Sequence, residues 1–388
     1  MGLGAMGDGR SYDAIVVGVG GMGSAAVYHL ARRGLRVLGL ERFDVPHEQG
    51  SSHGVTRIIR LAYYEHPSYV PLLRRAYQLW RELQSALGEQ LLYITGSLDA
   101  GPSESEVVRG SKLSCDLHGI EHELIDAAEI GRRWPGYRLP RGHVALHQPE
   151  GGFLLPERCV VGHVTAAQAI GAEVRARERV LGWEPRGEGV RVRTDRAEYE
   201  AGRLLVTAGP WIQELVAPLR GLAQPERQVL AWLQPTRPEH FALGRFPVFN
   251  MLVDEGRFYG FPVFGIPGFK FGCYHHLGEQ VDPDTMEREP NARDEALLRA
   301  FAERYFPEGA GPTMALKSCI FTNSPDEHFT IDLHPGLPQV VFASPCSGHG
   351  FKFCSVVGEI LADLAQRGET GHDIGLFRLS RLAGTASG

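Results

Sequence analysis

Residues 13–41, DAIVVGVGGMGSAAVYHLARRGLRVLGLE, decide the fold of this chain. Residues 13–18 are a short apolar run typical of a buried strand, and residues 22–33 have the composition of a helix. Residues 36–41 form a second apolar run that ends in an acid. The stretch therefore predicts a β-α-β unit, with a glycine-rich turn between the first strand and the helix.

The glycine-rich turn has the G-x-G-x-x-G spacing of a dinucleotide site, with glycine at positions 18, 20 and 23. Gly18 permits a tight turn, Gly20 lets a pyrophosphate approach the backbone, and Gly23 lets helix and strand pack closely. The N-terminus of the helix offers N–H groups and a positive dipole to the phosphates. Glu41 can accept the ribose hydroxyls and would repel the extra phosphate of NADP. The pattern alone fits NAD as well as FAD.

The rest of the chain alternates between α/β and β-rich character. The expected elements are an amphipathic helix at 68–86, a β-rich run at 173–208 that returns at 203–211 to the first sheet, short strands at 226–234, 257–264 and 269–275, a helix at 293–305, a strand at 339–343 and a helix at 350–366. The predicted class is α/β, α+β overall, with a Rossmann-like domain and a second, sheet-based domain.

Composition excludes several classes of partner. The 388 residues are 43% hydrophobic and 22% charged, with a formal net charge of -6, which argues against nucleic-acid or anionic-membrane partners. Residues 1–10 lack the pattern of a secretory signal, no apolar run reaches membrane-spanning length, and residues 385–388 are not a Ser-Lys-Leu signal. The six cysteines form no C-x-x-C pair, so we expect reduced thiols. We also expect no metal site. Because no targeting or membrane-spanning pattern occurs, we expect a cytoplasmic protein.

Lysine is scarce in this chain. It occurs only at positions 112, 270, 317 and 352, and every other residue in the total of 40 basic residues is arginine. Codon bias or a preference for arginine on the surface explains the arginines. It does not explain the lysines that remain, because arginine cannot replace a compact charge whose pKa can be tuned. The remaining lysines are therefore candidates for a chemical role.

Four blocks of sequence resemble the monomeric sarcosine oxidase and N-methyltryptophan oxidase family. They are residues 50–60 (GSSHGVTRIIR), 258–275 (FYGFPVFGIPGFKFGCYH), 317–334 (KSCIFTNSPDEHFTIDLH) and 347–353 (SGHGFKF). The blocks occur in the family's order along the whole chain. The resemblance implies FAD as the cofactor, an FAD-binding domain at 1–90, 140–220 and 319–388, and a substrate domain at 91–139 and 221–318.

The resemblance also implies that FAD is bonded through its 8α-methyl carbon to Cys319. A thiolate is the competent nucleophile for such a bond, and the nearby Lys317 could favour it. An isolated cysteine would be interpreted as a buried inert thiol, so this assignment depends on the surrounding block.

Other residues match family positions near the substrate or oxygen. Arg60 and Lys352 would bind the carboxylate of an amino acid, for which a bidentate arginine and a second cation are suited. Lys270 would promote the reaction of reduced flavin with oxygen, since a preorganised ammonium stabilises the negative charge that develops. Tyr259 and His275 match positions near the substrate.

A further set of residues would contact the cofactor. Gly348, His349 and Gly350 precede the last predicted helix, whose N-terminus could stabilise the anionic edge of reduced flavin. The remaining cofactor-binding candidates are Ser51, His53, Thr56, Arg57, Val180 through its backbone, and Lys352.

Three positions depart from the family pattern. Position 321 is Phe where sarcosine oxidases have Tyr, Cys346 replaces a bulkier apolar residue, and the loop 272–276 is one residue longer, so that either Tyr274 or His275 could face the substrate.

The expected activity is that of a monomeric oxidase whose partners are a small amine and molecular oxygen. Sarcosine or another N-methyl amino acid would give the demethylated amino acid, formaldehyde and hydrogen peroxide. The alternatives are oxidation of a cyclic secondary amino acid such as pipecolate or proline, an NAD-dependent dehydrogenase, and a flavin-binding subunit with no activity of its own.

Overall fold

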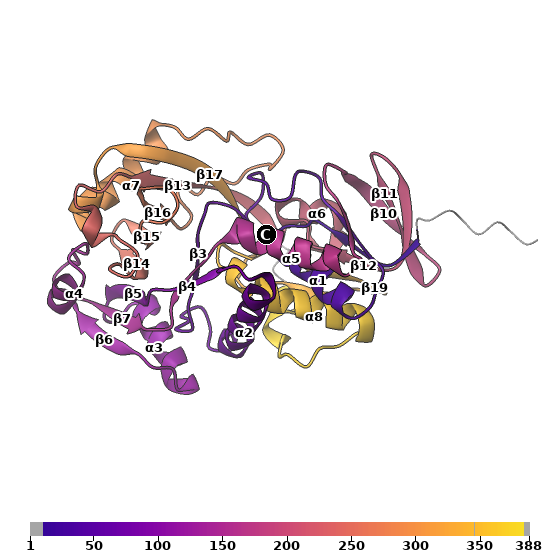
Figure 1. The fold of residues 1–388 in the computed structure, drawn as a ribbon, viewed down its shortest axis with the longest axis horizontal. Coiled ribbons are helices and arrows are strands. Elements are labelled where there is room, and N and C mark those ends of the chain that lie inside the picture. Colours follow the sequence, from indigo (N-terminus) through magenta and orange to yellow (C-terminus); the bar gives the residue numbers. More distant parts are fainter. Residues whose placement is uncertain (1–10, 345, 384–388) are drawn as a thin grey trace, which may run out of the picture. The chain divides into compact units, whose positions relative to one another are not determined.

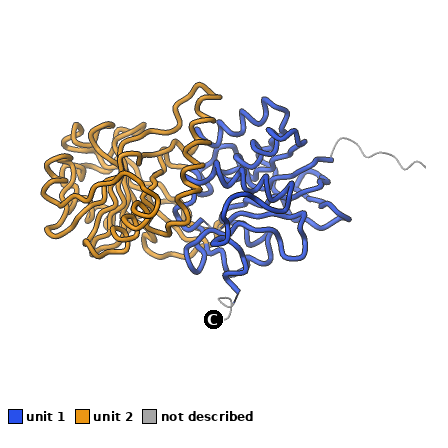
Figure 2. Tube along the Cα trace, turned by 90° about the horizontal axis from the view of Figure 1, so that it is seen from below, with its two compact units in different colours: residues 1–52, 158–224, 322–388 blue, residues 53–157, 225–321 orange. Residues whose placement is uncertain are grey.

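The computed structural model describes residues 11–344 and 346–383. The interpretations of residues 1–10 and 385–388 lie outside this range. The chain divides into two compact units, which Figure 2 shows in different colours. Unit 1 comprises residues 1–52, 158–224 and 322–388, and unit 2 comprises residues 53–157 and 225–321.

Unit 1 contains a sheet that is eight-stranded over the described residues, with the order β10-β11-β12-β1-β2-β9, and with β19 paired to both β12 and β18. Its strands are β1 (Ser11–Val17), β2 (Val37–Leu40), β9 (Glu173–Arg175), β10 (Val180–Arg186), β11 (Gly189–Thr194), β12 (Glu198–Val206), β18 (Ile331–His334) and β19 (Leu337–Ala343). The pairs β1-β2, β1-β12, β2-β9 and β12-β19 are parallel. The Rossmann-like class and the return of the chain near 203–211 are confirmed.

The helices of unit 1 are α1 (Gly21–Arg32), α5 (Pro156–Ala169), α6 (Ile212–Leu215) and α8 (Cys354–Arg367). Helices α1 and α8 lie side by side (Figure 1). They approach closely at Gly358, where an added Cβ would lie 2.5 Å from Ala25 Cβ. Glycine is therefore required at this crossing, because any side chain would push the two helices apart.

Unit 2 contains a second eight-stranded sheet, with the order β17-β13-β16-β15-β14-β5-β7-β6 among the described residues, and a small sheet with the order β3-β8-β4. The larger sheet consists of β5 (Ser97–Pro102), β6 (Glu123–Asp126), β7 (His143–Gln148), β13 (Gln224–Leu233), β14 (Val248–Val253), β15 (Gly256–Phe261), β16 (Phe269–Cys273) and β17 (Thr313–Asn323). The smaller sheet consists of β3 (Arg57–Ile59), β4 (Leu92–Ile94) and β8 (Gly152–Leu154).

The helices of unit 2 are α2 (Tyr69–Leu87), α3 (Glu106–His118), α4 (Ala127–Arg133) and α7 (Ala292–Tyr305). Short 3-10 helices of the two units lie at Gly209–Trp211, Ala217–Leu219, Pro238–His240, Pro307–Gly309, Phe351–Phe353, Gly375–Phe377 and Leu379–Leu382. Among the helices of the described chain, none is long and apolar enough to cross a membrane.

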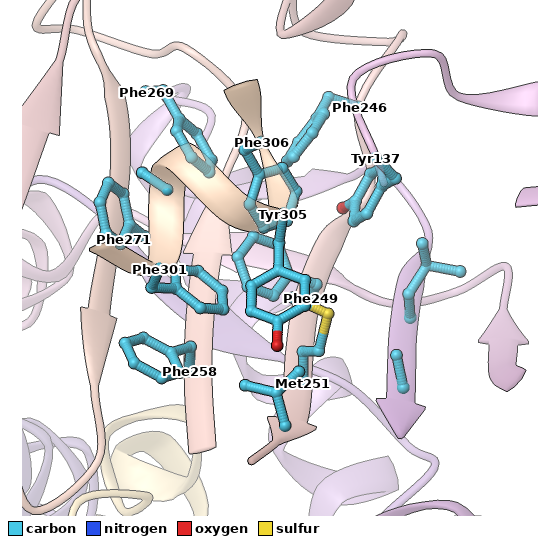
Figure 3. Packing of buried hydrophobic residues seen from close by; sticks show 14 of the residues in the cluster. Tyr137, Phe246, Phe249, Met251, Phe258, Phe269, Phe271, Phe301, Tyr305 and Phe306 are labelled. Atoms are coloured by element: carbon cyan, nitrogen blue, oxygen red, sulfur yellow. The ribbon is translucent and has the colours of Figure 1, made fainter. Parts of the chain in front are cut away.

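The core of unit 2 is rich in aromatic side chains between α7 and the larger sheet (Figure 3). The rings of Phe258 on β15 and Phe301 on α7 stack with their centroids 3.7 Å apart and their planes at 4°. Each fully buried phenylalanine stabilises the folded state by roughly 1.5–3 kcal/mol relative to exposure. One face of the sheet is thus firmly packed, and the opposite face of β15 and β16 is left to carry polar side chains.

The boundaries of the units differ from the expected domain boundaries in four places, one of which is residues 221–224, which belong to unit 1 and not to the second domain. Residues 53–90 and 140–157 belong to unit 2, because β3 pairs with β8 and because β7 pairs with β5 and β6. Residues 319–321 also belong to unit 2, because they continue strand β17 of the larger sheet. Cys319 is therefore part of unit 2.

The last helix also differs from its expected span. It was expected at 350–366, but α8 begins at Cys354 and is preceded by a 3-10 turn at Phe351–Phe353. Gly348 has a φ of +77°, so the chain turns sharply before the 3-10 turn begins. The residues Gly348 to Gly350 thus form a turn ahead of α8 and not its first turn.

Candidate functional site

The predicted site residues fall in both units, and the groups within each unit are described separately. In unit 1 the glycine turn has no room for side chains. A Cβ at Gly18, where φ is +86°, would lie 2.6 Å from the carbonyl oxygen of Thr207. A Cβ at Gly23 would lie 1.8 Å from the carbonyl oxygen of Gly18. Gly20 is the N-cap of α1 and has no side chain with which to cap that helix, so its N-terminus suits a phosphate.

Glu41 is buried behind this turn. Its carboxylate accepts hydrogen bonds from the backbone N–H of Val19 at 2.8 Å and of Phe43 at 3.0 Å, and His47 Nε2 lies 3.4 Å away. Burial alone would raise the pKa of Glu41, but His47 and the two N–H groups outweigh it and hold the pKa below its usual range. The side chain is therefore charged at neutral pH, as a ribose acceptor should be.

Two hydroxyl groups that the sequence did not single out support the glycine turn. Ser52 Oγ accepts a hydrogen bond from Gly21 N at 3.0 Å, whereas the neighbouring Ser51 was the predicted residue. Thr207 Oγ1 donates to Gly18 O at 2.7 Å. Thr207 directly follows strand β12, and a polar residue at the carboxyl end of a parallel strand is a signal that could have identified it.

The turn before α8 packs against the same glycine motif. A Cβ at Gly21 would lie 2.5 Å from Cys354 Sγ, and a Cβ at Gly350 would lie 2.4 Å from Cys346 Cβ. His349 is held by a hydrogen bond between its Nε2 and Glu327 O at 2.9 Å and stacks on the ring of Phe329. These contacts hold the turn in place. The expected stabilisation of the anionic edge of reduced flavin by this part of the backbone stays a prediction.

Two further predicted residues of unit 1 have mainly structural contacts. The ammonium of Lys352 is buried and donates to His349 O at 2.7 Å. Val180 begins β10, where it pairs with Thr194 and packs on the core of the unit. The expected contact of Val180 with adenine through its backbone remains a prediction.

In unit 2, the buried Lys270 is held by three hydrogen bonds. It lies on the interior strand β16, only 2% exposed, and its Nζ contacts Gly54 O at 2.6 Å, Thr56 O at 2.7 Å and Thr56 Oγ1 at 2.9 Å. Its neighbours Phe269 and Phe271 point to the other face, into the aromatic core. Burial and the nearby Arg57 lower the pKa of Lys270 well below its usual range.

The loop that Lys270 contacts is held from a second direction. Glu157, at the start of α5, accepts hydrogen bonds from the backbone N–H groups of Gly54 and Val55. Thr56 and His53 are each 1% exposed, so this loop is buried. Glu157 was not predicted, because nothing in the sequence relates it to residues 53–57.

Cys319 lies on β17 and is 3% exposed, in a small cluster with Leu230 and Trp232. Arg57 Nη2 lies 3.5 Å from its sulfur. Arg57 is thus a cation in contact with the sulfur, and the role expected for Lys317 stays a prediction.

Tyr259 on β15 belongs to an aromatic group that includes Tyr274 and Phe321. Its ring lies 5.1 Å from that of Tyr274, which in turn lies 5.7 Å from the ring of Phe321. His275 also approaches Phe321, at 6.4 Å, but its Nδ1 lies 3.1 Å from the carboxylate of Glu226. Of the two residues left open by the sequence, Tyr274 is the one in contact with Tyr259.

Arg60 is almost fully buried and already has two carboxylates around it. Its Nη2 lies 3.0 Å from Glu65 Oε2, its Nε lies 3.6 Å from Asp99 Oδ1, and its Nη1 donates to Ala62 O. Burial opposes the charge of Arg60, but Asp99 and Glu65 outweigh it and raise the pKa of Arg60. The guanidinium is therefore fully charged and oriented.

Asp99 is another residue that the sequence did not single out. It is completely buried on β5, and its carboxylate also accepts hydrogen bonds from Ser111 Oγ at 3.0 Å and Asn250 Nδ2 at 3.2 Å. Burial raises the pKa of Asp99, and Arg60 opposes this. The sequence signal that could have identified Asp99 is that it is the single acid in the strand Ser97–Pro102, because a buried acid in a strand requires a partner.

Comparisons with known proteins show similarity over most of the chain. The sequence pattern of the FAD dependent oxidoreductase family matches residues 13–364. The monomeric sarcosine oxidase of Bacillus sp. (strain NS-129) is 42% identical over 377 residues, which are 96% of this chain and 97% of that protein. The N-methyl-L-tryptophan oxidase of Citrobacter koseri is 37% identical, over 96% of this chain and 99% of that protein.

Solved structures are similar over the same length. That of NikD, described as an unusual amino acid oxidase essential for nikkomycin biosynthesis, matches with a TM-score of 0.83 and 28% identity, over 95% of this chain and 98% of that one. The similarity thus extends over both units and is not confined to the glycine motif of unit 1.

Proposed function

We propose that this chain oxidises sarcosine or another small N-methyl amino acid. The premise is that it belongs to the monomeric sarcosine oxidase and N-methyltryptophan oxidase family of FAD-dependent oxidoreductases. The balanced reaction converts the N-methyl amino acid, oxygen and water into the demethylated amino acid, formaldehyde and hydrogen peroxide. The observation that carries the proposal is the buried Lys270. Its ammonium donates hydrogen bonds to three oxygen atoms, and none of these atoms carries a negative charge.

The glycine turn of unit 1 fits the dinucleotide part of FAD. The space at Gly18 and Gly23 excludes any side chain, and the N-terminus of α1, whose N-cap Gly20 has no side chain, can accept a pyrophosphate. The charged carboxylate of Glu41 suits a ribose. When bound, FAD supplies the redox chemistry by taking two electrons and a hydrogen from the carbon beside the amine nitrogen.

Cys319 is the residue to which we assign a covalent bond with FAD. The contact between its sulfur and Arg57 Nη2 supports this assignment, because a thiolate is the nucleophile that such a bond requires. Arg57 is in turn positioned by a hydrogen bond from its Nη1 to Thr56 O at 3.0 Å. The same loop thus orients the guanidinium at Cys319 and accepts hydrogen bonds from Lys270.

Arg60 is assigned to the carboxylate of the amino-acid substrate, with Lys352 as a second cation. For Arg60 to bind a carboxylate through its Nη2, Glu65 must release that nitrogen, while Asp99 remains on Nε. Substrate binding would thus exchange one carboxylate for another and would leave the charge at the guanidinium unchanged.

Lys270 is assigned to the step with oxygen. Its buried ammonium would stabilise the negative charge that develops as oxygen is reduced, and its three contacts hold it in place before the charge forms. Tyr259 and Tyr274 are assigned to the substrate, with His275 next to them.

The test is formation of hydrogen peroxide by the purified yellow protein over a panel of amines. Sarcosine and other N-methyl amino acids should react, with pipecolate and proline as the second candidate class. The second class is favoured if Phe321, which lacks the hydroxyl of a tyrosine, leaves room for a ring. Reduction of added NAD without peroxide would instead indicate a dehydrogenase, and no turnover of any amine would refute the proposal. We also propose that the enzyme acts as a cytoplasmic monomer, which sedimentation and cell fractionation can test.

A further inference from the structure

Strand β13 places a tryptophan beside Lys270, on the face of the larger sheet opposite the aromatic core. Trp232 is directly opposite Lys270 in the antiparallel pair of β13 and β16, so the two side chains lie on the same face. Its neighbours Ala231 and Leu233 belong to the aromatic core. Trp232 itself packs in the small cluster that contains Cys319. The indole therefore lies with the residues assigned to FAD and to oxygen, and not in the core.

The indole N–H of Trp232 is buried without a hydrogen-bond partner. The side chain is fully buried, and no acceptor among the described residues reaches its Nε1. A buried indole N–H usually has a partner, because losing water without a replacement is unfavourable. Trp183, for comparison, donates from its Nε1 to Leu215 O at 2.8 Å. The unused N–H of Trp232 therefore indicates a position that a small acceptor occupies during function.

Lys270 has no N–H group left for such an acceptor. An ammonium has three N–H groups, and those of Lys270 all donate to the loop, at Gly54 O, Thr56 O and Thr56 Oγ1. Its Nζ lies over the ring of Trp232, 5.6 Å from the ring centre. The indole N–H lies in the plane of the ring, so this contact leaves it unused. Lys270 thus supplies a charge, and Trp232 supplies a donor.

The acceptor that suits this pair is oxygen while it is being reduced. Molecular oxygen is small and apolar, but it becomes a strong hydrogen-bond acceptor once it gains negative charge. The overall step transfers two electrons and two protons from reduced FAD to oxygen and gives oxidised FAD and hydrogen peroxide. A fixed N–H next to a cation stabilises a charge that exists only during this step.

We propose that the indole N–H of Trp232 donates a hydrogen bond to oxygen during its reduction, so that Trp232 is a catalytic residue of the oxygen step together with Lys270. This inference rests on the proposed function, because it takes Lys270 and FAD to perform that step. A hydrogen bond to a charged acceptor changes such a rate by about ten- to a hundredfold. The bond forms only as oxygen gains charge, so reduction of FAD by the amine does not depend on it.

The experiment measures reoxidation of the holoenzyme by stopped flow, after FAD has been reduced anaerobically with a stoichiometric amount of dithionite. No amine is needed, so the result does not depend on the preferred substrate. Trp232→Phe should slow reoxidation by oxygen at least about tenfold. Reoxidation by ferricenium, which takes up an electron without forming an anion, should be unchanged. Trp80→Phe, at an equally buried tryptophan of unit 2, is the matched control and should react with oxygen at the wild-type rate.

A second variant separates the N–H from the shape of the ring. The amino acid 3-benzothienylalanine at position 232 keeps the size of the indole and lacks the N–H. It should slow the reaction with oxygen as Trp232→Phe does, and it decides the outcome if Trp232→Phe does not fold. The visible absorbance spectrum of its oxidised FAD should match that of the wild type. A shifted spectrum would mean that the N–H is bonded to FAD, and it overturns the inference.

An unchanged rate with oxygen, or equal slowing with oxygen and ferricenium, also overturns the inference. The slowing should be the same at every pH, because an indole N–H does not titrate. A shifted pH profile would show that Trp232 acts through Lys270 and not on oxygen. Peroxide formation from sarcosine alongside such a result would leave the proposed function standing, whereas no turnover of any amine would refute the function itself.

Discussion

Arg57 Nη2 lies 3.5 Å from the sulfur of Cys319, and the two residues are brought together from strands β3 and β17, which are far apart in the sequence of unit 2. The guanidinium carries a permanent positive charge, so the contact places a cation against the sulfur.

The first prediction concerns this pair. Cys319→Ser should release all FAD into the supernatant on acid precipitation, and Arg57→Leu should release a large part of it, because the thiolate loses its cation. Absorbance of pellet and supernatant measures the split. Cys115→Ala, at a buried thiol on α3, is the control and should keep a yellow pellet. A yellow pellet from Cys319→Ser would refute the covalent assignment.

A second prediction concerns Asp99, whose carboxylate lies 3.6 Å from Arg60 Nε. Asp99→Asn removes one charge of a buried pair, and we expect KM for the amino acid to rise about tenfold or more while kcat changes less. Steady-state peroxide assays measure both constants. Asp116→Asn, at an exposed carboxylate that pairs with Lys112, should leave them unchanged. Equal losses in kcat and KM would argue for general damage and against positioning.

Lys270→Met is the third test. Stopped-flow measurements should show that reoxidation by oxygen slows by at least about a hundredfold, whereas reduction by substrate slows far less, because only the former needs the ammonium. Lys112→Met, at an exposed lysine of α3, is the control. Equal slowing of both half-reactions would rule out the assigned role.

The same lysine predicts a pH dependence. Its pKa in the folded chain is lowered well below 10.5, so the cation is present below that lowered value and is lost as the pH rises through it. The rate of reoxidation should therefore fall with rising pH earlier than an ordinary lysine would allow. The slow residual rate of Lys270→Met should not follow this profile.

The fourth prediction concerns stability and the buried pair Arg227 and Asp294. Arg227 donates to both oxygens of Asp294 at 2.9 and 2.8 Å, and His276 Nε2 lies 2.9 Å from Asp294 Oδ1. Asp294→Ala leaves Arg227 and His276 buried beside an empty position and should cost about 3–5 kcal/mol of unfolding free energy. Denaturant titration measures this, with Asp254→Ala at a side chain that is 88% exposed as the control.

The sign of the associated pH effect follows from the two pKa shifts. Burial would raise the pKa of Asp294, but Arg227 and the capping N–H of Asn291 outweigh it and lower the pKa to about 2. Burial lowers the pKa of His276 below 6.5, although Asp294 opposes this. Both groups bind protons less readily in the folded chain, so stability should decline below pH 6.5 and again between about 4 and 2. A melting temperature that is constant from pH 7 to pH 3 would contradict this.

The sequence predicted the parts of the fold that depend on local chemistry. The glycine turn, α1 and Glu41 were predictable because each requirement lies within 13–41, where spacing is directly readable. Lys270 was predictable for a different reason, since lysine is so rare in this chain that its presence is informative.

The contacts that orient the site were not predictable in the same way. Asp99 lies opposite Asn250 because β5 pairs with β14 in the larger sheet, and it also meets Arg60, which directly follows strand β3 of the smaller sheet. Glu157 meets Gly54 and Val55 across a separation of more than 100 residues. No local pattern encodes such pairings, because they arise from strand order and register.

The predicted domain boundaries differ from those of the two units for a related reason. Residues 140–157 have the composition of a connecting segment, yet they contain β7 and β8, which complete two sheets of unit 2. The late start of α8 likewise reflects the turn at Gly348, which the helical periodicity of the following residues does not reveal.

The close packing of Gly21 on Cys354 and of Ala25 on Gly358 has a consequence for the order in which the chain matures during synthesis. The nucleotide motif at residues 18–25 leaves the ribosome well before its packing partners at residues 346–358. Unit 2 ends at residue 321 and has its full set of strands before residues 346–358 are translated. A nascent chain stalled before residue 346 should therefore contain a folded unit 2 and a glycine motif that does not yet retain its nucleotide.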